Sequence, residues 1–138
     1  MSETAFYAAP NSDAIDYALR VARFHVEMLQ RRGVRLDGAE ILELGPGADF
    51  CAALVLASHG AKVTLADRFL TPWRDDFHPG FYRAFLDRYD GRKSAVEAVV
   101  AQGGYDGVLR RCRSRPRRWR TSPMPASTSC YPTPCWSM

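Results

Sequence analysis

The sequence predicts an α/β protein whose sheet strands run parallel. Two short apolar runs, "AEILEL" and "AKVTLAD", flank a segment that reads as a helix, and a glycine turn follows the first run. Strand, tight turn, helix and strand within about 30 residues form the βαβ unit of a parallel sheet. A chain of 138 residues has room for one domain with a moderate core.

The first expected element is a helix over residues 12–33. Ser12 or Asp13 can cap its N-terminus, and Gly33 can end it. Apolar residues recur between them at spacings of three and four, which is typical of one buried helical stripe. These residues are Ile15, Ala18, Leu19, Ala22, Val26 and Leu29.

Residues 39–44 form the first expected strand, since a nearly continuous apolar run before a glycine turn is typical of a strand buried on both faces. A helix over residues 49–60, closed by Gly60, and a second strand over residues 62–67 follow. Beyond them, the aromatic-rich "TPWRDDFHPGFYRAFLDRYDG" and then "KSAVEAVVAQGG" predict further short helices.

Residue usage changes at Arg110. From there to the end, residues 110–138 contain seven arginines and no acidic residue. This leaves 12 of the 19 basic and all 15 acidic residues in positions 1–109, a net charge of −3 against +7. We therefore expect the chain to divide into a domain over residues 1–109 and a disordered basic tail over residues 110–138.

A ligand site is expected where the first strand ends. Gly45 and Gly47 lie at its carboxyl end, where open α/β sheets bind ligands. Asp67 ends the second strand twenty residues past Gly47, and parallel pairing would bring its carboxylate beside the glycine turn, where it can accept both hydroxyls of a ribose. A dinucleotide site requires a third glycine, but Phe50 stands there. Glu43, two residues before Gly45, favours a positively charged cofactor over a pyrophosphate.

"ILELGPGADF" followed by "VTLADRF" resembles the first and second motifs of class I S-adenosylmethionine-dependent methyltransferases, over residues 39–69. The resemblance implies that residues 1–109 form a partial cofactor-binding domain, the N-terminal part of a Rossmann-like parallel-sheet fold, with S-adenosyl-L-methionine as cofactor. It implies that residues 43–47 lie along the methionine part, that Asp67 holds the ribose, and that Arg68 and Phe69 lie near the adenine. The implied cofactor-binding residues are Glu43, Leu44, Gly45, Pro46, Gly47, Asp67 and Arg68.

Some features depart from the family pattern or carry another interpretation. Asp49 stands where many family members have a third glycine, which predicts a less open loop. A βαβ unit that binds no cofactor would also use glycines to turn the chain and Asp67 to cap a loop. Cys51 is expected to be a packed side chain, and no residue is assigned a catalytic or metal-binding role. Three scattered histidines are expected on helix surfaces or in loops: His25, His59 and His78.

The tail composition is typical of a G/C-rich coding sequence read in the wrong frame. With permitted codons, the shifted frame of residues 122–138 can encode a peptide that resembles the fourth-strand motif of the same family. We therefore expect a methyltransferase truncated by a frameshift near residues 107–111, with weak cofactor binding, no transferase activity and a small molecule as the parent acceptor. The rival interpretation is a small α/β binding module whose arginine-rich arm contacts nucleic acid, with Trp119 stacking on a base.

Localisation is predicted from the apolar pattern. No apolar run approaches the roughly 18 residues of a membrane helix. The first twenty residues have neither a basic start nor a long apolar stretch. We therefore expect a cytoplasmic protein without a membrane partner.

Overall fold

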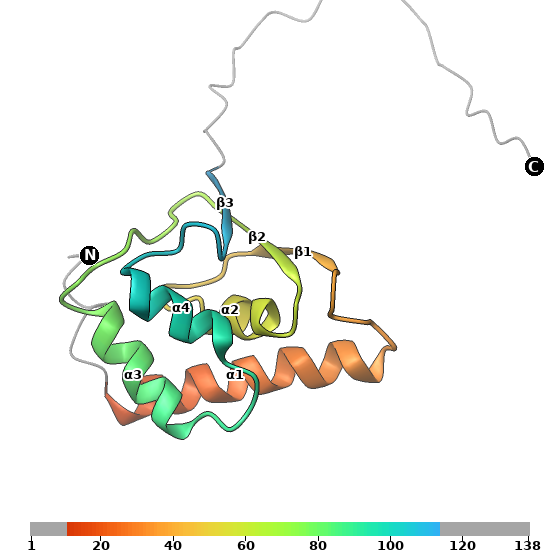
Figure 1. The fold of residues 1–138 in the computed structure, drawn as a ribbon, viewed down its shortest axis with the longest axis horizontal. Helices are drawn as coiled ribbons and strands as arrows, with labels where there is room; N and C mark the ends of the chain where they lie inside the picture. Colours follow the sequence, from red (N-terminus) through yellow and green to blue (C-terminus); the bar gives the residue numbers. More distant parts are fainter. Residues whose placement is uncertain (1–10, 114–138) are drawn as a thin grey trace, which may run out of the picture.

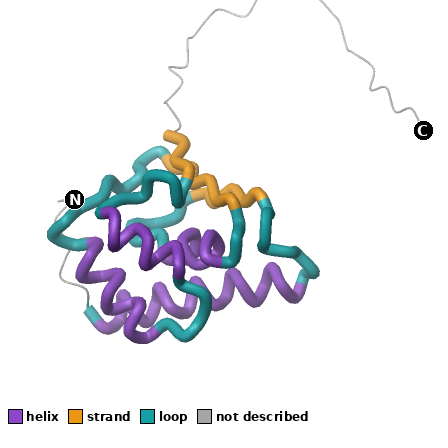
Figure 2. The backbone as a smooth tube through the Cα atoms, viewed as in Figure 1, coloured by secondary structure: helices purple, strands orange, loops and turns teal. Residues whose placement is uncertain are grey.

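The computed structural model describes residues 11–113. Within this range the chain is an α/β protein with four helices and a three-stranded parallel sheet. The strands are β1 (Glu40–Leu44), β2 (Lys62–Asp67) and β3 (Arg110–Arg113). Figure 1 shows the sheet along one side of the molecule with the helices gathered on the other, and Figure 2 shows the same division by colour. The predicted α/β class and parallel sheet are confirmed.

Helix α1 (Ser12–Arg31) buries the predicted stripe, from Ile15 to Val26. Its cap differs from the expected Ser12 or Asp13. The Asn11 side chain accepts a hydrogen bond of 2.8 Å from the Ala14 N–H, so the cap lies one residue before Ser12 and two residues before Asp13. The helix ends at Arg31, shortly before the predicted stop.

The predicted βαβ unit is present, with a shorter helix. Helix α2 (Cys51–Ser58) replaces the expected 49–60, because Phe50 at its start and Gly60 after its end both have positive φ angles, of 52° and 91°. The second strand has the predicted bounds. Strands β1 and β2 pair in parallel from Glu40 opposite Lys62 to Leu44 opposite Ala66.

The sheet order is β1-β2-β3, so β1 is an edge strand among residues 11–113. Burial of β1 on both faces was therefore wrong. Leu42 is 61% exposed and Leu44 is 72% exposed. Because the described helices cover only one face of the sheet, the opposite face of β1 stays open (Figure 2).

Strand β3 extends the ordered fold beyond the expected boundary at residue 110. It pairs in parallel with β2, from Thr64 opposite Arg110 to Asp67 opposite Arg113. Ladder hydrogen bonds involve backbone groups, so an arginine-rich segment without apolar alternation can still add a strand. Residues 114–138, with most of the expected tail and its nucleic-acid arm, lie outside the described residues.

The other two helices follow β2 as predicted: α3 (His78–Arg88) and α4 (Ser94–Gln102). They pack with α1, α2 and the inner face of the sheet around one apolar core. The largest side chains fully buried in this core include Tyr82, Tyr105, Phe50, Phe85 and Leu54.

Between residues 11 and 113 there is no helix both long and apolar enough to cross a membrane.

Candidate functional site

The glycine loop (residues 45–50) connects β1 to α2. Gly45 and Gly47 have φ angles of 65° and 77°, in the left-handed region that favours glycine. A Cβ at either position would meet no heavy atom within 4 Å, so the loop backbone faces open space there. The Gly45 N–H donates to the Ala66 carbonyl at 3.2 Å, which ties the loop to the end of β2.

A cavity of about 280 Å³ lies between the glycine loop and α1. This volume is near the lower end of ligand sites, which are roughly 300–1,000 Å³. Five of the seven predicted cofactor-binding residues line it together: Glu43, Leu44, Gly45, Pro46 and Gly47. Tyr17, Val21 and His25 of α1 also line it. Sequence reasoning missed this contribution, although their spacing of four residues along a helix is a signal that they share a face.

The other two predicted residues lie outside this cavity. Asp67 follows the Leu44–Ala66 pair by one register step, so it lies at the same carboxyl edge of the sheet as Gly45. One oxygen of Asp67 accepts a hydrogen bond of 3.0 Å from the Phe69 N–H, which closes a local turn. The Arg68 guanidinium lies 5.3 Å from the centre of the Phe69 ring, and both side chains are exposed.

Glu43 places a carboxylate with unmet hydrogen-bonding capacity at the cavity. Within the described part of the chain, its Oε2 is the one buried side-chain oxygen or nitrogen without a hydrogen-bond partner. Burial raises the pKa of Glu43; His25 opposes this shift, and the charge of Asp49 adds to it. A buried oxygen of this kind costs free energy unless a ligand donor or cation meets it.

Asp49 adds a second acid to the site. Its Oδ1 accepts a hydrogen bond of 2.8 Å from the Cys51 N–H at the first turn of α2. Burial is the main cause that raises the pKa of Asp49, and the hydrogen bonds from Cys51 oppose the shift. Phosphate-binding loops leave such helix N–H groups for the ligand anion. Here a protein carboxylate occupies one of them, which disfavours a pyrophosphate and favours a cationic group.

Helix α3 contacts the glycine loop through side chains that sequence reasoning also missed. His78 has no exposed surface, so its expected place on a helix surface or in a loop was wrong. Its Nε2 lies 3.4 Å from the Ala48 carbonyl, and the Tyr82 hydroxyl donates to the Asp49 carbonyl at 2.5 Å. The four-residue spacing of His78 and Tyr82 is the only signal for a shared face that the sequence holds. Cys51 is packed in the core, as predicted.

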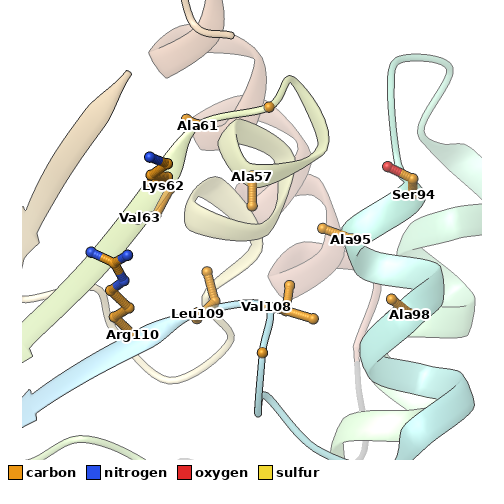
Figure 3. A pocket seen from close by; sticks show the side chains of 12 residues that line it. Ala57, Ala61, Lys62, Val63, Ser94, Ala95, Ala98, Val108, Leu109 and Arg110 are labelled. Atoms are coloured by element: carbon orange, nitrogen blue, oxygen red, sulfur yellow. The ribbon is translucent and has the colours of Figure 1, made fainter. Parts of the chain in front are cut away.

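A larger cavity, of about 550 Å³, lies elsewhere (Figure 3). Lys62 and Arg110, at the starts of β2 and β3, line it on one side, and Ser94 and Ala98 of α4 lie across from them. It contains none of the predicted site residues. Because it lies at the amino ends of the strands, whereas open α/β sheets bind ligands at the carboxyl ends, we place the candidate site at the glycine loop.

Comparisons of the chain with protein-family models, with curated proteins and with solved structures find no match in any of the three. A cluster of three or more histidine, cysteine, aspartate or glutamate side chains able to hold a metal ion does not occur in residues 11–113. The chemistry of the site therefore rests on the glycine loop, its two acids and the residues that surround them.

Proposed function

We propose that this chain carries the S-adenosyl-L-methionine site of a Rossmann-like, class I methyltransferase-type domain. Three features support the proposal. Two segments within residues 39–69 resemble the first and second motifs of that family, at the separation expected for them. The parallel β1-α2-β2 unit turns through Gly45 and Gly47 at the carboxyl edge of the sheet. Two acids, Glu43 and Asp49, flank that turn.

The buried, unpartnered Oε2 of Glu43 is the observation that carries the proposal. The cofactor presents an ammonium group, which can donate a hydrogen bond to this oxygen, and a sulfonium group, which can offset its negative charge. A cation about 4 Å from a carboxylate gains roughly 4 kcal/mol at an effective dielectric of about 20, before the cost of desolvation is subtracted. The residues at the cavity thus fit a cationic ligand better than a nucleotide phosphate.

The rest of the cofactor follows from the resemblance. In the proposal, the methionine part lies along residues 43–47 and the ribose hydroxyls reach the carboxylate of Asp67. The Phe69 ring, which is 77% exposed beside Arg68, offers an apolar face to the adenine. Asp67 uses one oxygen in its local turn, and its second oxygen is available to a ribose hydroxyl.

The bound cofactor supplies an activated methyl group, and the described residues bind and orient it. No acceptor-side group is assigned; a small-molecule acceptor remains our expectation for the parent enzyme. Since β1 is an edge strand within residues 11–113, the ligand would be enclosed from one side, and we propose weak binding without methyl transfer. The frameshift interpretation concerns the gene, and resequencing the region that encodes residues 107–111 tests it.

Calorimetric titration with S-adenosyl-L-methionine and with S-adenosylhomocysteine tests the proposed site. Glu43→Gln keeps the shape of the side chain and removes its charge, so we expect affinity for the first ligand to fall about tenfold, equivalent to about 1.4 kcal/mol. Glu40→Gln is the matched control, because Glu40 lies exposed on the same strand and outside the cavity. Equal affinities for wild type and Glu43→Gln, or preferential binding of NAD, would contradict the proposal.

The nucleic-acid alternative depends on residues that are mostly outside the described range. Association with nucleic acid that weakens steeply with salt, and that disappears when residues 110–138 are deleted, would favour it.

A further inference from the structure

The second half of the glycine loop is held by α3 as well as by its own helix. The Asp49 carbonyl accepts a hydrogen bond of 2.5 Å from the Tyr82 hydroxyl, while the Asp49 side chain accepts one of 2.8 Å from the Cys51 N–H. The neighbouring Ala48 carbonyl lies 3.4 Å from Nε2 of His78. Thus α3 contacts two successive carbonyls of a loop that lies about 30 residues earlier in the chain.

The hydrogen bonds around His78 define its tautomer. Its Nδ1 accepts a hydrogen bond of 2.9 Å from the Arg74 N–H, so the ring proton of the neutral form is on Nε2 and points to the Ala48 carbonyl. Burial is the main cause that lowers the pKa of His78, which favours this neutral form. The ring stacks on Trp73, with 5.2 Å between ring centres.

Tyr82 is oriented in a similar way. Since its hydroxyl proton goes to the Asp49 carbonyl, the Tyr105 hydroxyl, 2.8 Å away, donates to the Tyr82 oxygen. Burial raises the pKa of both phenols, so both stay protonated and able to donate near neutral pH. The result is a relay of two hydroxyls that ends on the loop backbone.

The loop adopts a conformation that needs such support. Phe50 is fully buried and has a φ of 52°, a left-handed angle that is an outlier for a bulky residue. Such angles persist only where surrounding contacts over-determine them. The Phe50 ring packs 5.1 Å from the Tyr105 ring, which belongs to the same cluster as Tyr82.

We propose that His78 and Tyr82 are positioning residues of the ligand loop: by holding the Ala48 and Asp49 carbonyls, they fix the direction of the Asp49 carboxylate and the shape of the glycine loop. The effect on the loop stands on these contacts alone, whereas the effect on ligand affinity rests on the proposed function. A purely structural role in the aromatic core would stabilise the whole domain and would leave the loop unaffected.

Two tyrosine variants of the full chain separate these roles. Tyr82→Phe and Tyr105→Phe each remove one hydroxyl from the same buried pair, but only Tyr82 donates to the loop. The reporter is the Cys51 amide, whose exchange with solvent deuterium is measured by NMR, with α1 amides as the reference for global opening. We expect Tyr82→Phe to speed Cys51 exchange about fivefold to tenfold relative to α1, and Tyr105→Phe to leave this ratio within about twofold.

A second pair keeps the test available if Tyr82→Phe fails to fold. His78→Asn retains an acceptor near the position of Nδ1 and removes the Nε2 donor, whereas His78→Gln retains a donor near Nε2. We expect faster Cys51 exchange in His78→Asn and near wild-type exchange in His78→Gln. Equal exchange ratios within the pairs would overturn the positioning role.

Binding of S-adenosylhomocysteine separates this inference from the proposed function. We expect affinity to fall about fivefold to tenfold in Tyr82→Phe and to stay within about twofold of wild type in Tyr105→Phe. If wild type binds no ligand while the exchange difference is present, the proposed function fails and the positioning role stands. If wild type binds and the exchange ratios are equal, the positioning role fails and the binding site stands.

Discussion

Replacing glycine by alanine at two positions should change stability in opposite directions. Gly47, in the glycine loop, has a φ of 77°, whereas Gly80, in the first turn of α3, does not have a positive φ. A new Cβ would meet no heavy atom within 4 Å at Gly47, and none beyond its own helix turn at Gly80. Crowding therefore cannot distinguish the two substitutions, and the backbone angle is the remaining difference.

The expected magnitudes follow from that angle. A Cβ in the left-handed region costs about 1–2 kcal/mol. Alanine also lowers the entropy of the unfolded chain, which offsets part of this cost, so Gly47→Ala should lower the free energy of unfolding by about 1 kcal/mol. Gly80→Ala should raise it by about 0.5–1 kcal/mol, because alanine is the better helix former. Urea unfolding followed by far-UV circular dichroism measures both values.

The sign is the decisive result. A Gly47→Ala variant as stable as wild type would show that the loop relaxes to a conformation with negative φ, and the geometry argued for the ligand site would then be wrong. A destabilising Gly80→Ala would contradict the helical conformation of α3 at its start. An altered urea dependence in either variant would indicate a change in the unfolded or native ensemble, and the comparison would then use the transition midpoints alone.

Three further outcomes are expected. Leu42→Lys should change the free energy of unfolding by less than about 0.5 kcal/mol, because Leu42 is largely exposed. An open, apolar edge strand such as β1 favours pairing between chains, so we also expect this lysine to lower the light scattering of concentrated protein. Burial lowers the pKa of His78 in the fold, so the stability that its neutral form contributes is lost as pH falls below 6.5. His78→Gln should therefore weaken the fall in the free energy of unfolding with decreasing pH, as measured by acid unfolding. The part that remains includes the contribution of His59, whose pKa is lowered as well. Cys51 should resist alkylation in the native protein while Cys112 reacts, as peptide mass spectrometry will show, since burial raises the pKa of the Cys51 thiol.

The sequence by itself determined the elements whose signals are local. A stripe of apolar residues at helical spacing defined α1, and alternating strand, turn and helix signals defined the β1-α2-β2 unit. Gly45 and Gly47 marked the loop because few other residues tolerate its backbone angles. The grouping of residues 43–47 at one cavity also followed, since they are neighbours in the chain.

Local signals were insufficient where the environment comes from another element. The apolar pattern of β1 predicted burial on both faces, but periodicity does not reveal whether a second layer covers a strand. The sequence did not predict β3, because its arginine-rich residues show no alternation of apolar and polar side chains. Its pairing with β2 uses backbone hydrogen bonds, which leave no signal in the sequence. The observed caps and helix ends differ from the predicted ones by one to a few residues, because several neighbouring side chains, such as Asn11 and Ser12, are able to cap the same helix.

Only the tertiary structure decided how the candidate site is built. The surroundings of the unpartnered Glu43 oxygen depend on the position of α1, whose His25 lines the same cavity. The contacts of His78 and Tyr82 with the loop carbonyls join residues about 30 positions apart in the chain. Hydrogen bonds and desolvation act over a few ångströms in space, whatever the separation along the chain, so they exist only once the helices have packed against the sheet.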